Sequence, residues 1–332
     1  MDACIALDAM GGDHGSRELI SGALMAIREA RIKVSLVGDT KSLQEHLQSL
    51  SPERRCAGRL DIVHASQVVE MKEHPVDAIR KKKDASVVVA FDLVRSGDAD
   101  GVVSAGNSGA TLAAGMRKLG RLQGVARPGI ASYFPTRKRP VVLMDIGANV
   151  DCKPLHLFQF AVMASAYFRL QGSESPRVGL LTIGEEAGKG NSLIKETYPL
   201  LEKSSLNFIG NVEGRDVFRG DVDVIVCDGF VGNVCLKVSE GLAEAAMEML
   251  RAEIIKSLPA KLGYLLASRA FARFKRRVDY AEYGGAPLLG LDGVGFVCHG
   301  KSSAVAIKNA ILEAARMANS SIRDEILEGL SS

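Results

Sequence analysis

The stretch Val224–Gly241, VIVCDGFVGNVCLKVSEG, contains a strand, a glycine-bearing turn and a helix in direct succession. Its first four residues are apolar and suit a fully buried strand. The turn falls at Asp228-Gly229, and the apolar positions after Val231 repeat with a helical period. A helix start offers N–H groups without partners inside the helix, and its dipole favours an anion. The stretch therefore predicts either an anion-binding turn or an ordinary helix start capped by Asp228.

The same order of strand, glycine-bearing loop and helix recurs along the chain. Five such loops begin at Met10, Ala105, Asp145, Gly184 and Asp228. Strands that alternate with amphipathic helices predict parallel βαβ units and an α/β fold with a mostly parallel sheet. Ligands of such sheets bind outside the carboxyl ends of the strands. We therefore expect the five loops to share one edge of the sheet and to offer N–H donors to a phosphate.

The pattern also gives approximate boundaries. Strands are expected at residues 4–7, 34–37, 60–64, 101–104, 141–144, 178–183, 206–209, 222–227 and 294–298. Helices are expected at about 16–30, 41–50, 85–96, 110–119, 155–170 and 303–317. A chain of 332 residues can bury a large core, and we expect residues 1–332 to form one large α/β domain.

Composition narrows the class of protein. The net charge of +3 implies no overall field for nucleic acid, so no nucleic-acid partner is expected. The six Cys are scattered without a CxxC pair, which suits reduced thiols in a cytosol. The N-terminal residues 1–15 do not have the pattern of a signal peptide, and no apolar run approaches the ~20 residues that span a bilayer. These features predict a cytoplasmic protein.

Several common catalytic motifs are missing from the sequence. No loop reads GxGxxG or GxxxxGK[ST], which argues against a nicotinamide enzyme and a P-loop nucleotidase, and there is no GxSxG. Cys298 and His299 are neighbours at the end of a strand, where adjacent side chains point to opposite faces, so a Cys–His nucleophile pair is not expected. The six His have no ligand spacing. We expect neither a metal nor a cofactor.

The segment of about 240–292 differs from the rest. Its apolar residues keep a helical spacing up to Pro259, and a second helical pattern follows. Between Arg251 and Arg277 there are eight basic residues and one acid, Glu253. The segment is either a helical pair packed on the core with a solvated basic face, or a projecting helical arm. Such an arm would dimerise, touch a membrane surface or dock an acidic partner.

Six motifs together resemble one family. They are DAMGGDH (8–14), SAGNSGA (104–110), DIGANVD (145–151), IGEEAGKGN (183–191), DGFVGN (228–233) and YGGAPLLGLDG (283–293). In this order they resemble the bacterial acyl-acyl-carrier-protein:phosphate acyltransferases of phospholipid synthesis, essentially from end to end. The chain departs from the family at Gly15-Ser16, where Ala-Pro is usual, at Ser108, where Thr is usual, and at Thr182, where Asn is usual.

The resemblance implies a Rossmann-like α/β/α sandwich, related to phosphate acetyltransferases and isopropylmalate dehydrogenases. It implies a homodimer that is cytoplasmic and associates peripherally with the inner membrane. The implied reaction transfers a long-chain acyl group from acyl carrier protein to inorganic phosphate. The acyl phosphate would then feed a membrane glycerol-3-phosphate acyltransferase.

Motif and resemblance together suggest specific site residues. Lys189 is expected to neutralise phosphate or the thioester oxyanion, Asp228 to orient the nucleophile or move its proton, and Asn233 to donate to the developing charge. Phosphate binding is expected at Gly106, Asn107, Ser108, Gly109, Gly229 and Gly232. The substrate pocket is expected to include Asp8, Gly11, Gly12, His14, Asn149 and Glu185. Carrier-protein or membrane contact is expected from Leu262, Leu265, Leu266, Arg269, Arg273, Arg276 and Arg277.

Two other functions fit parts of the sequence. A short-chain phosphate acetyl- or butyryltransferase would use coenzyme A on a similar fold, but it has no obvious use for the 251–277 segment. A non-catalytic scaffold that recruits lipid enzymes to a membrane would leave the five glycine loops without a purpose. Phosphate-dependent release of free carrier protein distinguishes all three.

Overall fold

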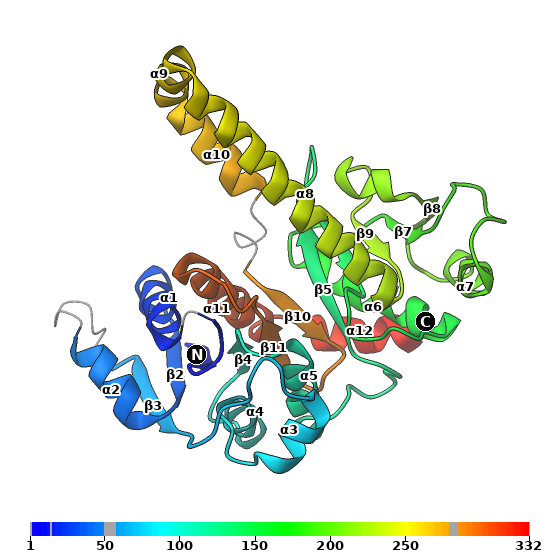
Figure 1. Ribbon diagram of the computed structural model, residues 1–332. Helices are drawn as coiled ribbons and strands as arrows, with labels where there is room; N and C mark the ends of the chain where they lie inside the picture. The colour runs from blue at the N-terminus through cyan, green and yellow to red at the C-terminus, as the bar shows by residue number, and fades with distance from the viewer. Residues whose placement is uncertain (1, 14, 50–57, 279–283, 332) are drawn as a thin grey trace.

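The computed structural model of the chain describes residues 2–13, 15–49, 58–278 and 284–331, and these residues form an 11-stranded sheet between two layers of helices (Figure 1). The strand order is β3-β2-β1-β4-β11-β10-β5-β6-β9-β7-β8. Most neighbouring strands are parallel, which confirms the expected Rossmann-like α/β/α architecture with a mostly parallel sheet.

One half of the sheet is a parallel block from the N-terminal part of the chain, joined by β11. Its strands are β1 (Cys4–Asp8), β2 (Lys33–Gly38), β3 (Leu60–His64), β4 (Gly101–Ser104) and β11 (Val294–Val297). Its helices are α1 (Ser16–Glu29), α2 (Thr40–Gln48), α3 (Pro75–Lys81), α4 (Ser86–Ser96), α5 (Ser108–Lys118) and α11 (Ala304–Ala318).

The other half is a second parallel block. Its strands are β6 (Val141–Met144), β7 (Val178–Leu181), β8 (Phe208–Val212) and β9 (Val224–Val226). Its helices are α6 (Pro154–Arg169), α7 (Ser192–Glu202), the short 3₁₀ helix η2 (Gly214–Phe218) and α12 (Ile322–Ser331), which packs on α6.

Two strands that the sequence pattern did not predict, β5 (Gly129–Phe134) and β10 (Ala286–Leu289), join the blocks. The pairs β11–β10, β10–β5 and β5–β6 are all antiparallel, so the two blocks run in opposite directions. The expectation that all five loops share one edge is therefore wrong. The loops after β1 and β4 leave one block, whereas those after β6, β7 and β9 leave the other.

The register of these central strands nevertheless brings the carboxyl ends of the blocks together. Ala286 pairs with Val297, which pairs with Ser104 at the end of β4. Leu288 pairs with Ile130, and Met144 at the end of β6 pairs with Ala131. The last residues of β4 and β6 thus lie at nearly the same level of the sheet, although the two strands run in opposite directions.

The core follows the alternation of strand side chains. In β9, Val224 and Val226 face one layer of helices and Ile225 faces the other. In β1, Leu7 faces the same layer as Val224, and Ala6 faces the same layer as Ile225. Because side chains alternate along a strand, an apolar strand with helices on both faces buries every residue. All three residues of β9 are fully buried, as expected for the stretch at Val224.

A helical arm projects from the body (Figure 1). It consists of α8 (Gly229–Lys256), α9 (Leu258–Leu266) and α10 (Ser268–Val278). The expected upper boundary of 292 needs correction, because residues 286–289 form β10 inside the sheet. The first turns of α8, from Gly229, pack on the body before the helix enters the arm. Ser257 caps α9 by accepting a hydrogen bond from the Ala260 N–H at 3.2 Å. Among the described helices, none is long and apolar enough to cross a bilayer.

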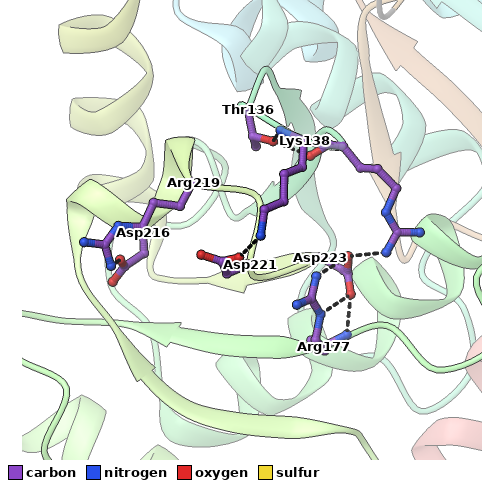
Figure 2. A network of polar contacts seen from close by, with 8 residues as sticks. Thr136, Lys138, Arg177, Asp216, Arg219, Asp221 and Asp223 are labelled. Atoms are coloured by element: carbon purple, nitrogen blue, oxygen red, sulfur yellow. Dashed lines mark hydrogen bonds and ion pairs between the residues drawn. The ribbon is translucent and has the colours of Figure 1, made fainter.

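The hairpin between β5 and β6 is held at the outer end of the second block by a polar network (Figure 2). The buried Asp223 carboxylate accepts hydrogen bonds from Arg177 N and Nε, both at 2.9 Å, and forms an ion pair with Arg139 Nη2 at 3.2 Å. Lys138, in the hairpin turn, forms an ion pair with Asp221. Burial alone would raise the pKa of Asp223, but the hydrogen bonds from Arg177 outweigh it and lower the pKa below its ordinary value.

Candidate active site

A cavity of about 230 Å³ lies where the carboxyl ends of the two blocks meet. Its polar lining comes from five segments: the start of α5, Ser132 in β5, the loop after β6, the first turns of α8, and the loop after β11. The residues that these segments supply include Ser108, Gly147, Asn233, Lys237, Glu240, His299 and Ser302. Of the site residues expected from the sequence, Ser108 and Asn233 line this cavity.

The start of α5 provides backbone donors. Asn107 caps the helix, since its Oδ1 accepts from the Ala110 N–H at 3.0 Å, and its Nδ2 donates to the carbonyls of Met71 and Glu73. The Asn107 side chain is thus fully used within the protein. The N–H groups of Ser108 and Gly109 lie in the first turn, where a helix supplies no acceptor. They are the donors that this loop can offer to an anion.

The loops after β1, β4 and β11 pack against one another next to the start of α5. Gly11 packs so closely on the next loop that a Cβ there would lie 2.7 Å from Gly106 N, and Asp13 N donates to the Gly300 carbonyl at 2.7 Å. Buried Asp8 accepts from Ser104 Oγ at 2.7 Å, and burial raises its pKa. Asp8, Gly11 and Gly12 are thus positioned as a scaffold behind α5. His14 lies outside the described residues.

The loop after β6 is organised around the buried carboxylate of Asp145. Its Oδ1 accepts from the N–H groups of Ile130, Gly147 and Ala148, and its Oδ2 accepts from Asn149 N at 2.7 Å. The Asn149 side chain donates to the same carboxylate and to the Pro128 carbonyl. Asn149 therefore holds the loop in shape, and Ile146 and Gly147 are the residues that the loop presents to the cavity.

The N–H groups at the start of α8 are largely committed inside the protein. Gly229 N donates to the Asn149 carbonyl at 2.7 Å, Val231 N to Asp228 Oδ1 at 2.9 Å, and Gly232 N to the Asp228 carbonyl at 3.0 Å. Both Gly229 and Gly232 thus donate their N–H groups to acceptors inside the protein, and their role in phosphate binding stays a prediction. Their lack of a side chain lets α8 pack closely on the loop after β6.

Three other expected residues lie outside the lining of this cavity. Asp228 caps α8, which is the ordinary alternative that the sequence left open. Lys189 lies in the loop after β7, where its side chain folds over Gly184. Glu185, in the same loop, forms an ion pair with Arg215 at 3.3 Å. The catalytic roles assigned to Lys189 and Asp228 stay predictions.

The sequence reasoning missed Lys237, Glu240, His299 and Ser302. Lys237 follows Asn233 by one helical turn, so both face the same side of α8, and its Nζ pairs with Glu240 Oε2 at 2.8 Å. His299 Nδ1 accepts from Lys301 N at 3.1 Å. A helical count from Asn233 would have found Lys237. The approach of His299 depends on the position of β11, which local pattern does not show.

Burial disfavours the thiolate form of Cys298, the cysteine beside His299. Cys298 is 3% exposed, and burial raises the pKa of its thiol to about 12. A thiol needs a lowered pKa to react as thiolate. Among the described residues, no group of three His, Cys, Asp or Glu side chains is arranged to hold a metal ion.

The arm residues expected to make outside contacts are exposed where the structure describes them. Leu262, Leu265 and Leu266 are 59%, 67% and 81% exposed, and Arg269 and Arg273 are exposed as well. The side chains of Arg276 and Arg277 lie outside the described part of the chain.

Solved structures similar to this chain define its class. A phosphotransacetylase from Streptococcus pyogenes matches with a TM-score of 0.64 at 16% identity, covering 96% of this chain and 94% of that chain. The EutD phosphotransacetylase from Staphylococcus aureus matches with a TM-score of 0.62 at 19% identity and the same coverage. At such low identity the likeness shows the fold alone: the chain has the α/β fold of the phosphotransacetylases.

Sequence relatives identify the family. A family model described as "Fatty acid synthesis protein" matches residues 3–324. The phosphate acyltransferase of Geotalea uraniireducens (strain Rf4) is 55% identical over 329 residues, covering 98% of this chain and 94% of the relative. That of Nitratidesulfovibrio vulgaris (strain DP4) is 54% identical over 328 residues with the same coverage. The chain belongs to the phosphate acyltransferase family, and it is an acyltransferase.

Proposed function

We propose that this protein transfers a long-chain acyl group from acyl carrier protein to inorganic phosphate and releases an acyl phosphate for phospholipid synthesis. The observation that carries the proposal is the cavity between the blocks. Ser108 at the start of α5 lines it together with Asn233 and Lys237, in a chain of the phosphate acyltransferase family. The continuous sheet supports the proposal that one large α/β domain is the functional unit.

The reaction needs orientation and charge stabilisation more than a protein nucleophile. A phosphate oxygen attacks the thioester carbonyl carbon, a C–O bond forms, the C–S bond breaks, and the proton of hydrogen phosphate passes to the leaving thiolate. The site therefore has to hold an anion beside a carbonyl and stabilise the oxyanion. The Ser108 and Gly109 N–H groups suit the anion. The Asn233 amide and the Lys237 ammonium suit the developing charge.

Lys189 and Asp228 keep their proposed roles in a conformation with substrate bound. Lys189 is exposed, in a loop with glycines on both sides, and Asp228 is the residue that sets the start of α8. Movement of the loop after β7 would be needed to bring Lys189 to the phosphate. The Asp228 carboxylate, at the start of α8, would orient the attacking phosphate or move its proton.

The arm supports a homodimer. One face of α8 carries an exposed apolar stripe with a spacing of four residues near its start. The stripe consists of Phe230, Val234, Val238, Leu242 and Met249, with exposures of 61%, 47%, 63%, 69% and 69%. An exposed apolar face of this length is typical of a protein–protein contact. A second copy of the chain, which carries the same stripe, is the proposed partner.

The tip of the arm supports peripheral attachment to the cytoplasmic side of the inner membrane. Exposed Leu262, Leu265 and Leu266 are followed in the chain by α10, whose Arg269 and Arg273 are exposed as well. Apolar insertion combined with attraction to anionic lipid, at about 1 kcal/mol per basic residue, gives reversible binding. The same basic residues suit an acidic carrier protein, and attachment would place the product near a membrane glycerol-3-phosphate acyltransferase.

A direct assay tests the function. Palmitoyl carrier protein and phosphate are mixed with the enzyme, free carrier thiol is measured, and hydroxylamine traps the acyl phosphate as a hydroxamate. We expect thiol and hydroxamate in equal amounts, both dependent on phosphate. Activity with acetyl or butyryl coenzyme A but not with the carrier protein would favour the short-chain transferase. No activity with either donor would favour the scaffold.

A further inference from the structure

A second and larger cavity lies on the arm. Its volume is about 840 Å³, and its lining comes from α8, α9 and α10. Most of the lining is apolar and includes Met247, Leu250, Ile254, Tyr264 and Phe271. Arg251 and Lys261 contribute its cationic groups. The reaction steps proposed above do not use this cavity.

One face of α8 connects the two cavities. Residues spaced alternately three and four apart lie along the same side of a helix. Such a row begins at Asn233 and continues through Leu236, Glu240, Ala243, Met247, Leu250 and Ile254. Its first three members line the cavity between the blocks, and its last three line the arm cavity. Ala243, the smallest of the seven, lies between these two sets and lines neither cavity.

The polar residues of this row all belong to its body end. Asn233 and Glu240 lie there, with Leu236 between them, whereas the arm end has only the apolar Met247, Leu250 and Ile254. The row spans about 30 Å at 1.5 Å per residue, and Glu240 to Met247 spans about 10 Å. A thioester with a long hydrocarbon tail has the same order, a polar reacting group followed by methylenes.

We infer that the acyl chain of the substrate lies along this face of α8, with its carbonyl beside Asn233 and its terminal methylenes in the arm cavity. This inference rests on the proposed function and deepens it, since it assigns the specificity for long chains to the arm. The apolar stripe proposed for dimer contact runs along the opposite face of the helix, because its members are offset from the row by about half a turn. Both contacts can therefore form at once.

A blocking substitution tests the path. Ala243→Trp places a large ring between the two cavities, and Ala246→Trp is the matched control at an exposed position that lines neither cavity. KM and kcat are measured with butyryl and palmitoyl carrier protein. In Ala243→Trp we expect KM for the palmitoyl donor to rise by about tenfold or more, because each methylene kept from apolar surface costs roughly fourfold. For the butyryl donor, and for both donors with Ala246→Trp, we expect changes within about twofold.

The outcomes separate this inference from the function on which it rests. Wild-type protein that forms no acyl phosphate with any donor contradicts the function. An active Ala243→Trp variant with the wild-type ratio of long- to short-chain KM overturns the acyl path while leaving the function standing.

A photo-crosslink on the wild-type protein decides the question if Ala243→Trp does not fold. The probe is palmitoyl carrier protein with a diazirine at the terminal methyl end. We expect the label within the segments 247–255 or 264–272. Labelling confined to other segments overturns the inference.

Discussion

Gly232 lies so close to Asp145 that a Cβ on Gly232 would be 1.9 Å from the Asp145 carbonyl oxygen. This approach joins the first turn of α8 to the loop after β6. Both segments line the cavity between the blocks, through Asn233 and Gly147. The geometry of the candidate site thus depends on a glycine that offers no chemistry of its own.

Gly232→Ala should damage both stability and activity. The added methyl cannot fit against a backbone carbonyl, so α8 has to move, and overpacking of this kind costs about 1–3 kcal/mol. We expect a lower urea midpoint and a loss of turnover greater than the loss of folded protein. Gly241→Ala, where no atom lies within 4 Å of a new Cβ, is the control. Turnover of Gly232→Ala at the wild-type level would contradict this account.

Asn233→Ala should lower kcat with little effect on stability. The side chain lines the cavity on the exposed side of α8, and loss of one donor to a developing oxyanion costs roughly 100-fold or more in rate. Glu244→Ala, at an exposed position of the same helix outside both cavities and outside the apolar stripe, should leave kcat near wild type. The role proposed for Asn233 fails if the two variants have similar kcat values.

Substitutions can show whether Asp228 and Lys189 act in the reaction or only stabilise the fold. Ser is about as good a helix cap as Asp, so Asp228→Ser should keep the folding free energy within a few tenths of a kcal/mol. If Asp228 also acts in the reaction, kcat falls by more than tenfold all the same. Lys189→Ala, at an exposed loop position, should lower kcat without a change in stability. Folded variants with near wild-type turnover would reject either role.

The network at Asp223 predicts a dependence of stability on pH. The pKa of this carboxyl is lower in the folded protein than in the unfolded chain. Its stabilisation is therefore complete above the unfolded value of about 3.9 and is lost as pH falls through the folded value. Asp223→Asn should cost about 1–3 kcal/mol at neutral pH and less at about pH 3. Urea unfolding of both proteins at the two pH values measures this, and a difference independent of pH would exclude it.

The arm tip can be tested with Leu262→Glu combined with Leu265→Glu. Both side chains are exposed, so folding should be unaffected, whereas charge opposes insertion between lipid headgroups. We expect the variant to stay in solution when anionic vesicles are sedimented, with unchanged turnover on a soluble donor. Sedimentation like the wild type would remove the membrane role of the tip. Loss of the dimer in size-exclusion chromatography would instead assign the tip to the subunit contact.

Local pattern predicted the parallel units well, because β1, β4, β6, β7 and β9 are short apolar runs that end at glycine-bearing loops. It did not find β5 or β10. β5 follows Pro128, and β10 contains Pro287 between glycine-rich segments, so both resemble turns. Without these strands the opposite directions of the two blocks could not be foreseen.

Two lining residues of the candidate site were predicted from local pattern, and the others were not. Ser108 and Asn233 lie next to helix starts, where sequence pattern is informative. The internal bonds of Asn107, Asn149 and Gly229 depend on partners far away in the chain, such as Met71 and Pro128. Lys237 and His299 reach the cavity because α8 and β11 converge there. Such convergence is a property of topology, not of local composition.

The central place of β10 and β11 also has a kinetic consequence. Both strands come late in the chain, after the whole of α8, α9 and α10, yet β11 pairs with β4 and β10 pairs with β5. Pairing over such long separations is slow, because the intervening chain must lose conformational entropy before the strand contacts can form. Until residues 286–297 have been synthesised, the edges of β4 and β5 lack their partners, and unpaired edges are templates for aggregation. The halves of this protein are therefore joined last, and a chain shortened before residue 286 should aggregate rather than yield a smaller folded protein.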